Sequence, residues 1–264
     1  MKILVINLDR SPERLAHMRA MFSEAGLSFE RVPAVDSREL TDEDIAKWRQ
    51  GVPNFYELRA GEVACFLSHR RCWEIAAAND DHFTVICEDD IYLGRNAAAV
   101  LSSSRWIPGN VGIVKLEASG RPAIVSRDEA ARIDNRKLHR LHHDTSGSAC
   151  YLISAACARR LLEKTYTFCD PVDQHLFNSE LPYTHGEAVF QLVPAPAIQE
   201  FLLKRKGTAT LGSTLRGERP NKRRTGLRKI MRELTRPFEK LGRYAIASGM
   251  NLFGKRLCLK VAFR

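Results

Sequence analysis

The chain has 264 residues, of which 44% are hydrophobic, enough for a sizeable core in one large domain or in one domain with an appendage. The composition is that of a globular protein and excludes a wholly disordered one. The net charge of +10 is unevenly placed, because residues 216–264 hold 15 lysines and arginines against 3 acids while the rest is nearly neutral. A basic C-terminal part indicates an anionic surface as partner, either nucleic acid or acidic lipid.

Neither the cysteines nor the N-terminus indicates export. The seven cysteines are an odd number without the spacing of zinc ligands, so we expect most of them to be small buried side chains in a reducing compartment. The first apolar run is too short for a signal peptide, and no run reaches the roughly 18 apolar residues of a membrane-spanning helix. We therefore expect a cytoplasmic protein.

Strands and helices are predicted to alternate along the first 200 residues. Hydrophobic periodicity and capping residues, such as Ser11 before Pro12, Thr41 and Ser154, mark the elements. The expected strands are 3–8, 29–35, 83–87, 112–116, 149–153 and 189–193, and the expected helices are 12–25, 41–50, 61–79 and 154–164. This order predicts an α/β fold with a mostly parallel sheet flanked by helices.

The C-terminal quarter differs in character from the rest. Residues 207–221 are rich in Gly, Ser, Thr and Arg, and between 227 and 241 apolar residues recur every three to four positions among basic ones. We therefore divide the chain into a catalytic domain at 1–206, a linker at 207–225 and a basic amphipathic helical tail at 226–264. Such a helix suits an anionic membrane surface, and a tail that packs on the body or is disordered is the alternative.

Three consecutive acids end the predicted strand at 83–87, in the stretch VICEDDIYL. Adjacent carboxylates raise each other's pKa, so burying them is costly unless something offsets the charge. In an open α/β sheet ligands bind at the C-terminal ends of the strands, where a divalent cation suits clustered carboxylates. The alternative is a solvated acidic turn.

Several further motifs occur in order along the chain. They are Asn7-Leu8-x-Arg10-x-x-x-Arg14, Ala34-Val35-Asp36-x-Arg38-x-Leu40, Gly61-Glu62-x-x-Cys65-x-Leu67-Ser68-His69, Glu88-Asp89-Asp90, Lys115-Leu116, Gly147 to Ser154 and Pro171-Val172-Asp173. Together they resemble glycosyltransferase family 25, of the lipooligosaccharide galactosyltransferase type, over about residues 1–200.

The resemblance implies a GT-A-like domain that uses a UDP-sugar, usually UDP-galactose, with Mn²⁺ or Mg²⁺ and with inversion at the anomeric carbon. The expected acceptor is a glycan or glycolipid, such as the lipooligosaccharide or lipopolysaccharide core. A peripheral location at the inner face of the cytoplasmic membrane would follow if the tail binds anionic lipid. The tail itself lies outside the resemblance.

The acids suit this chemistry, because a cation that bridges a diphosphate neutralises the charge of the leaving group. Residues two apart on an extended segment face the same side, so Glu88 and Asp90 are expected to converge while Asp89 points away. We expect Asp90 to be the direct metal ligand, with Glu88 and Asp89 as supporting ligand or ribose contact. His175 is a further candidate metal ligand, with a surface histidine as the alternative.

Inversion needs a base that takes a proton from the acceptor hydroxyl. Asp173 is the first candidate, and an N-cap for a helix near Gln174 is its alternative role.

The remaining expected contacts are with the nucleotide sugar. Two arginines beside a helix N-terminus suit phosphate. His69 could donate to phosphate or sugar or be structural, Asp36 could bind uracil or ribose or end a turn, and Lys115 could reach phosphate or be a charge at a strand end. The full set is Asn7, Arg10, Arg14, Asp36, Ser68, His69, Glu88, Asp89 and Lys115.

Two other classes of protein were compatible with the sequence. A nuclease-like protein could use the acids for metal and the basic tail for nucleic acid, but the body shows no basic groove and we expect no nucleic acid partner. A non-catalytic scaffold of transferase fold is the second alternative, and the intact acids and arginines argue against it.

Overall fold

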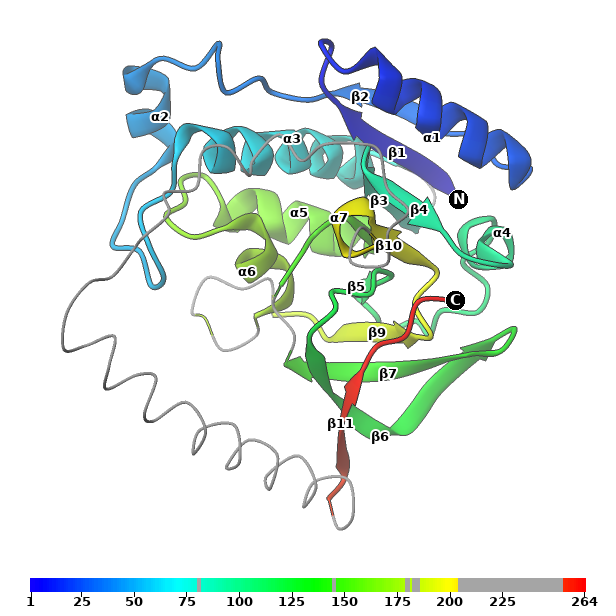
Figure 1. Cartoon of the computed structure of the whole chain (residues 1–264). Coiled ribbons are helices and arrows are strands. Elements are labelled where there is room, and N and C mark those ends of the chain that lie inside the picture. Colours follow the sequence, from blue (N-terminus) through cyan, green and yellow to red (C-terminus); the bar gives the residue numbers. More distant parts are fainter. Residues whose placement is uncertain (80–81, 144–145, 179–180, 182–185, 204–253) are drawn as a thin grey trace, which may run out of the picture.

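The computed structural model describes residues 1–79, 82–143, 146–178, 181, 186–203 and 254–264. These residues form an α/β structure around a nine-stranded sheet, with helices on both faces (Figure 1). The strands are β1 (Lys2–Asn7), β2 (Glu30–Pro33), β3 (Phe83–Glu88), β5 (Ile113–Lys115), β6 (Pro122–Ile133), β7 (Arg136–His143), β8 (Cys150–Ser154), β9 (Val189–Val193) and β11 (Arg256–Lys260). A separate two-stranded sheet pairs β4 (Ile91–Leu93) with β10 (Ala197–Gln199).

The strand order is β11-β6-β7-β9-β5-β8-β3-β1-β2. β1 pairs in parallel with β2 and β3, and β5 with β9, whereas β8 lies antiparallel between β3 and β5. Following the pairings across the sheet, β1, β2, β3, β5, β6 and β9 run one way and β7, β8 and β11 the other. Most strands are thus co-directional, as predicted, although antiparallel neighbours interrupt them.

Both faces of the sheet are buried, because alternate residues of each strand enter different cores. In β1, Leu4 packs in the core under helix α3 (Ala60–Ala77), whereas Val5 packs in the core that contains Met18 of helix α1 (Pro12–Glu24). Helix α5 (Ala155–Lys164) lies beside α3 on the first face, and α4 (Ala97–Leu101) covers the second (Figure 1). The period of two in the strands places each apolar side chain in one core or the other.

The predicted caps are confirmed for two helices. The Thr41 hydroxyl accepts from Asp44 N at 3.1 Å at the start of α2 (Asp42–Trp48), and the Ser154 hydroxyl accepts from Cys157 N at 3.1 Å at the start of α5. Ser11 precedes α1 as expected but makes no capping bond with its side chain. The short helices α6 (Val172–Phe177) and α7 (Glu200–Leu203) complete the described elements.

The antiparallel hairpin β6–β7 was not predicted. Its strands expose many polar side chains and carry register shifts, so their sequence lacks the compact apolar run of a strand buried on both faces. The expected helical tail at 226–264 is wrong at its end, because 256–260 form β11 and pair antiparallel with β6 (Figure 1). Val261, directly after β11, is buried in the core. The rest of the expected tail up to residue 253, and all of the expected linker at 207–225, lie outside the described residues.

None of the helices in the described ranges combines the length and the apolar character needed to span a bilayer. The cysteine prediction is confirmed for Cys72, Cys87, Cys150 and Cys157, which are buried and free. Cys65, Cys169 and Cys258 are half-buried.

Candidate active site

A pocket opens at the C-terminal ends of β1, β2 and β3, where the chain passes from β1 to β2 on one side and β3 lies on the other. This is the topological switch point at which open α/β sheets bind ligands. The pocket encloses about 790 Å³, counted with its open mouth. Its lining includes seven of the predicted site residues, namely Arg10, Arg14, Ser68, His69, Glu88, Asp89 and Asp90.

Glu88 and Asp90 converge in this pocket, as expected, although Asp90 lies in the turn after β3 and not in an extended segment. The amide nitrogen of Gln199, at the end of β10, lies 3.3 Å from Glu88 Oε2 and 3.3 Å from Asp90 Oδ1. One donor therefore serves both carboxylates, which share one small region of space.

The pKa values of the two carboxyls are shifted in opposite directions. Burial and the charge of Glu88 raise the pKa of Asp90 to about 7. Burial alone would raise the pKa of Glu88 as well, but the hydrogen bond and charge of His69, with a bond from Ser148, bring it below its usual value. One acid of the pair is therefore ionised while the other titrates near neutrality.

Asp89 also lines the pocket, but its partners differ from those of Glu88 and Asp90. It accepts from Asn7 Nδ2 at 2.7 Å and from Arg14 Nη1 at 2.7 Å. Burial lowers the pKa of Arg14, but Asp89 and Asp90 outweigh it, and the net shift is upward. The same burial raises the pKa of Asp89 despite its two donors. Asn7 and Arg14 thus tie β1 and α1 to the turn after β3.

Arg10 and Asp36 form a pair at the mouth of the pocket. Arg10 Nε lies 2.5 Å from Asp36 Oδ2, and this hydrogen bond lowers the pKa of Asp36. Ser68 is buried, accepting from Val35 N at 2.9 Å and donating to Ala64 O at 2.7 Å. Its hydroxyl therefore anchors the end of β2 to α3.

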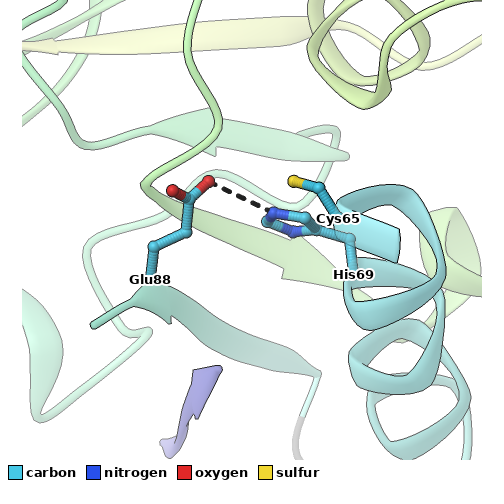
Figure 2. A group of neighbouring side chains, drawn as sticks. All are labelled: Cys65, His69 and Glu88. Carbon is cyan, nitrogen blue, oxygen red and sulfur yellow. Dashed lines mark hydrogen bonds and ion pairs between the residues drawn. The ribbon is translucent and has the colours of Figure 1, made fainter. Parts of the chain in front are cut away.

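His69 is fully buried beside Glu88 (Figure 2). Its Nε2 lies 3.4 Å from Glu88 Oε1, and its Nδ1 lies 3.0 Å from the Tyr151 hydroxyl. The Trp73 indole donates to that same hydroxyl at 2.8 Å. Tyr151 is thus a core residue, as expected, and it also sets the orientation of the His69 ring.

Asp173 lies in the first turn of α6, one residue inside the helix rather than at its N-cap. Gly147 N donates to Asp173 Oδ2 at 3.0 Å, and the next residue, Ser148, donates to Glu88 Oε1 at 3.0 Å. Within the described ranges, Asp173 Oδ1 has no hydrogen-bond donor, and burial raises the pKa of this carboxyl. A single loop thus connects the candidate base to the acidic pair.

Five predicted site residues lie outside the pocket lining, namely Asn7, Asp36, Lys115, Asp173 and His175. Lys115 is fully buried, donates to Ser146 O and has its ammonium 4.6 Å from the Phe177 ring, so it holds the loop before Gly147. His175 is also buried, edge-on to Phe66 at 4.9 Å between ring centroids. The surface alternative for His175 is therefore wrong.

Reasoning from the sequence missed three residues that shape the pocket. Gln199 belongs to no motif and reaches the acids only because β10 pairs with β4, which directly follows them. Cys65 was quoted within a motif without a role, although its spacing of four from His69 on a helix places both on one face. Ser148 lies within the motif Gly147 to Ser154, but no role was assigned to it.

The acidic pair fits a divalent cation. Two carboxylates that converge on one donor, one of them with a pKa raised by the other, form a concentration of negative charge that a cation would relieve. Hard cations such as Mg²⁺ use one or two carboxylates and complete their shell with water and substrate phosphate. The oxygen donors of Glu88 and Asp90 match that requirement.

Comparison with known proteins points to the same family as the motifs. The model of glycosyltransferase family 25 (LPS biosynthesis protein) matches residues 1–176. The lacto-N-neotetraose biosynthesis glycosyltransferase LgtE of Neisseria meningitidis serogroup B is 30% identical over 254 residues, which are 90% of this chain and 89% of that protein. A glycosyltransferase 25 family member of Aedes aegypti is 36% identical over 188 residues, 66% of this chain and 30% of that protein.

Among solved structures, the catalytic domain of Drosophila β1,4-galactosyltransferase 7 in complex with xylobiose aligns with 86% of this chain and 82% of that chain. The TM-score is 0.35 and the identity 12%, too weak a likeness to support an argument. The family match covers more than half of the chain, and LgtE is related over nearly the full length of both proteins. The chain therefore belongs to glycosyltransferase family 25 and is a glycosyltransferase.

Proposed function

We propose that the protein is an inverting, metal-dependent glycosyltransferase of GT-A type that moves galactose from UDP-galactose to a glycan of the lipooligosaccharide or lipopolysaccharide core. The observation that carries the proposal is the convergence of Glu88 and Asp90 in a pocket at the switch point of the sheet. Relatives in Neisseria are named for lacto-N-neotetraose biosynthesis, which supports a glycan acceptor.

Glu88 and Asp90 would hold Mn²⁺ or Mg²⁺, which supplies charge neutralisation to the departing diphosphate when bound. Arg10 lies at the pocket mouth, where it pairs with Asp36. When a nucleotide binds, its guanidinium can leave Asp36 and donate hydrogen bonds to the phosphates. Arg14 and Asn7 occupy the carboxylate oxygens of Asp89, which leaves Glu88 and Asp90 as the acids for the cation.

Asp173 would take the proton of the acceptor hydroxyl. A general base needs an oxygen that can accept a proton and a pKa nearer to neutrality than that of a free carboxyl. Among the described residues Asp173 Oδ1 has no hydrogen-bond donor, although it is buried, and burial raises the pKa of this carboxyl. Its second oxygen is oriented by Gly147 N, in the loop whose Ser148 also orients Glu88.

The proposal is tested by metal-dependent donor binding and turnover. Wild type, Asp90→Ala and the control Asp128→Ala, which removes an exposed acid outside the pocket, are compared over a panel of UDP-sugars with Mn²⁺ and with chelator. We expect use of UDP-galactose, and a loss of at least about 100-fold in kcat/KM in Asp90→Ala alone, because a metal contributes several kcal/mol to charge stabilisation. Equal activity with Mn²⁺ and with chelator would overturn the proposed metal dependence. Use of a UDP-sugar other than UDP-galactose would overturn the proposed donor.

We also propose that the basic sequence of residues 226–253 brings the enzyme to anionic lipid at the inner face of the cytoplasmic membrane. Support comes from the sequence alone, in which apolar residues alternate with lysine and arginine at helical spacing. If the acceptor is anchored in the same membrane, binding of the enzyme there would raise the effective concentration of the acceptor at the active site.

A further inference from the structure

Helix α3 presents a thiol and an imidazole to the end of β3, beside the acidic pair. Cys65 and His69 are one helical turn apart and point toward Glu88 (Figure 2). One ligand atom from each, a sulfur, a ring nitrogen and a carboxylate oxygen, lie within 4.8 Å of one another. Among the described residues, no other group of three such side chains comes together in this way.

The imidazole is held in the orientation that metal ligation requires. Ligating histidines keep their second nitrogen in a hydrogen bond, which sets the tautomer and the ring plane. Here His69 Nδ1 faces the Tyr151 hydroxyl, which the Trp73 indole holds in turn, so Nε2 is directed at Glu88. With Nε2 on a cation, Nδ1 carries the proton and donates to the Tyr151 oxygen.

The carboxylate is held as well. Ser148 donates to Glu88 Oε1 on the side of His69, and Gln199 donates to Oε2 on the side of Asp90. All three side chains of the group line the pocket, so an ion entering from solvent can reach them. The site thus has three protein ligands, outer-shell partners and an open side.

We propose that Cys65, His69 and Glu88 form a second metal site, which takes a borderline transition cation of the Zn²⁺ or Co²⁺ class. Thiolate, imidazole and carboxylate together are the ligands of such ions, whereas Mn²⁺ and Mg²⁺ prefer the oxygens of Glu88 and Asp90. Binding forms the sulfur–metal bond and releases the thiol proton to solvent.

The two sites share Glu88, so their occupancies are coupled. A cation between Cys65 and His69 draws on the same carboxylate charge as one beside Asp90, and the second cation is then bound more weakly. Zn²⁺ is therefore expected to raise the Mn²⁺ concentration that the enzyme needs. This coupling rests on the proposed function, whereas the existence of the site does not.

Cobalt absorption tests the site directly in the metal-free full-length protein under reducing, oxygen-free conditions. Co²⁺ is titrated into wild type, Cys65→Ser, Asp90→Ala and the control Cys169→Ser, whose thiol is half-buried like that of Cys65 but outside the pocket. We expect one equivalent with thiolate-to-cobalt charge transfer in wild type, Asp90→Ala and Cys169→Ser. In Cys65→Ser the band is expected to disappear and affinity to fall at least about tenfold, since even outer-shell partners contribute that much.

Retention of the band in Cys65→Ser, or its absence in wild type, would overturn the site. A second measurement needs no variant and so guards against misfolding. In wild type, Zn²⁺ should slow alkylation of Cys65, read by mass spectrometry of its peptide, and leave Cys169 unchanged. Equal alkylation rates of Cys65 with and without Zn²⁺ would also count against the site. Asp90→Ala removes the Glu88–Asp90 pair but keeps Cys65, His69 and Glu88, so cobalt binding in this variant distinguishes a failure of the new site from a failure of the pair.

Discussion

Three adjacent acids are tolerated after β3 because each has a different set of partners. Glu88 accepts from Ser148 and lies beside His69, Asp89 pairs with Arg14 and Asn7, and Asp90 shares an amide with Glu88. Burial and the neighbouring charge of Glu88 raise the pKa of Asp90 to about 7, even though Arg14 acts in the opposite direction. The residue at which charge is least compensated is the one expected to take the metal.

Asp90 also makes stability depend on pH in the absence of metal. Its pKa is 3.8 as a free side chain and about 7 in the folded protein, so between these values the folded state holds a proton that the unfolded state has released. The contribution is full below about pH 4 and is lost as pH rises through about 7. In chelator, Asp90→Asn should therefore gain stability over wild type at pH 8 relative to pH 5.

Urea unfolding at the two pH values measures this difference, with Asp128→Asn as the exposed control. If Asp90→Asn changes the free energy of unfolding by the same amount at pH 5 and pH 8, ionisation of Asp90 does not destabilise the folded protein.

At the scale of elements, one buried ion pair joins helix α1 to the turn between β3 and β4. The side chains of Arg14 and Asp89 are only 8% and 9% exposed, so each charge depends on the other. Because this pair fixes the Asp89 carboxylate on Arg14 and Asn7 within the pocket lining, the packing of α1 contributes to the geometry of the acids.

Removing one partner should leave a buried charge uncompensated. We expect Arg14→Leu to lower the free energy of unfolding by about 3 kcal/mol, and Arg14→Leu with Asp89→Leu to recover part of that loss. The control Arg19→Leu, on the exposed face of the same helix, should change stability by about 0.5 kcal/mol or less. Urea denaturation measures all three, and equal effects of Arg14→Leu and Arg19→Leu would contradict the role given to the pair.

The loop at Gly147 connects Asp173 with Glu88 and requires glycine. Its φ is +84°, and a Cβ there would lie 2.9 Å from Glu117 Oε1. Gly26, with a φ of +67° and no atom within 4 Å of such a Cβ, provides a matched control.

Gly147→Ala and Gly26→Ala should both lose about 1 kcal/mol or more from the left-handed backbone. Only Gly147→Ala should also reduce kcat, because displacement of the loop disturbs the bonds to Asp173 and Glu88. Steady-state kinetics with saturating donor measures the difference, and unchanged kcat in Gly147→Ala would show that the loop does not position the two acids.

At the scale of the whole molecule, the C-terminal part of the chain combines a strand of the sheet with a basic sequence before it. Residues 256–260 add the edge strand β11 to the sheet, and Phe263 bridges to Ala195. The basic residues between the catalytic body and this strand remain outside the described part of the chain, so their role is argued from charge.

Their proposed lipid contact predicts binding to anionic vesicles. Replacement of Arg228, Arg232 and Arg236 by Gln should weaken binding to phosphatidylglycerol vesicles at least about tenfold, since each basic residue contributes about 1 kcal/mol at such a surface. The control replaces three exposed arginines of the body, Arg95, Arg105 and Arg121. Vesicle sedimentation at two salt concentrations measures binding, and equal losses in both variants would assign it to net charge alone.

The sequence by itself determined the α/β class, most of the buried elements, the family and the position of the three acids. Local rules were sufficient there, because strands buried on both faces have compact apolar sequences, and the end of such a run places the acids at the end of β3. The turn at Asp89 and Asp90, not strand alternation, then brings Glu88 and Asp90 together. The half-exposed strands β6 and β7 lack such runs and were missed.

Only the tertiary structure decided which distant residues complete the pocket. Gln199 reaches the acids through the pairing of β10 with β4, and Lys115 and His175 are packed away from the pocket lining by contacts with Phe177 and Phe66. The C-terminal strand β11 likewise depends on an unpaired edge of β6. Such contacts join residues far apart in the chain, and their free energy depends on packing that no local pattern encodes.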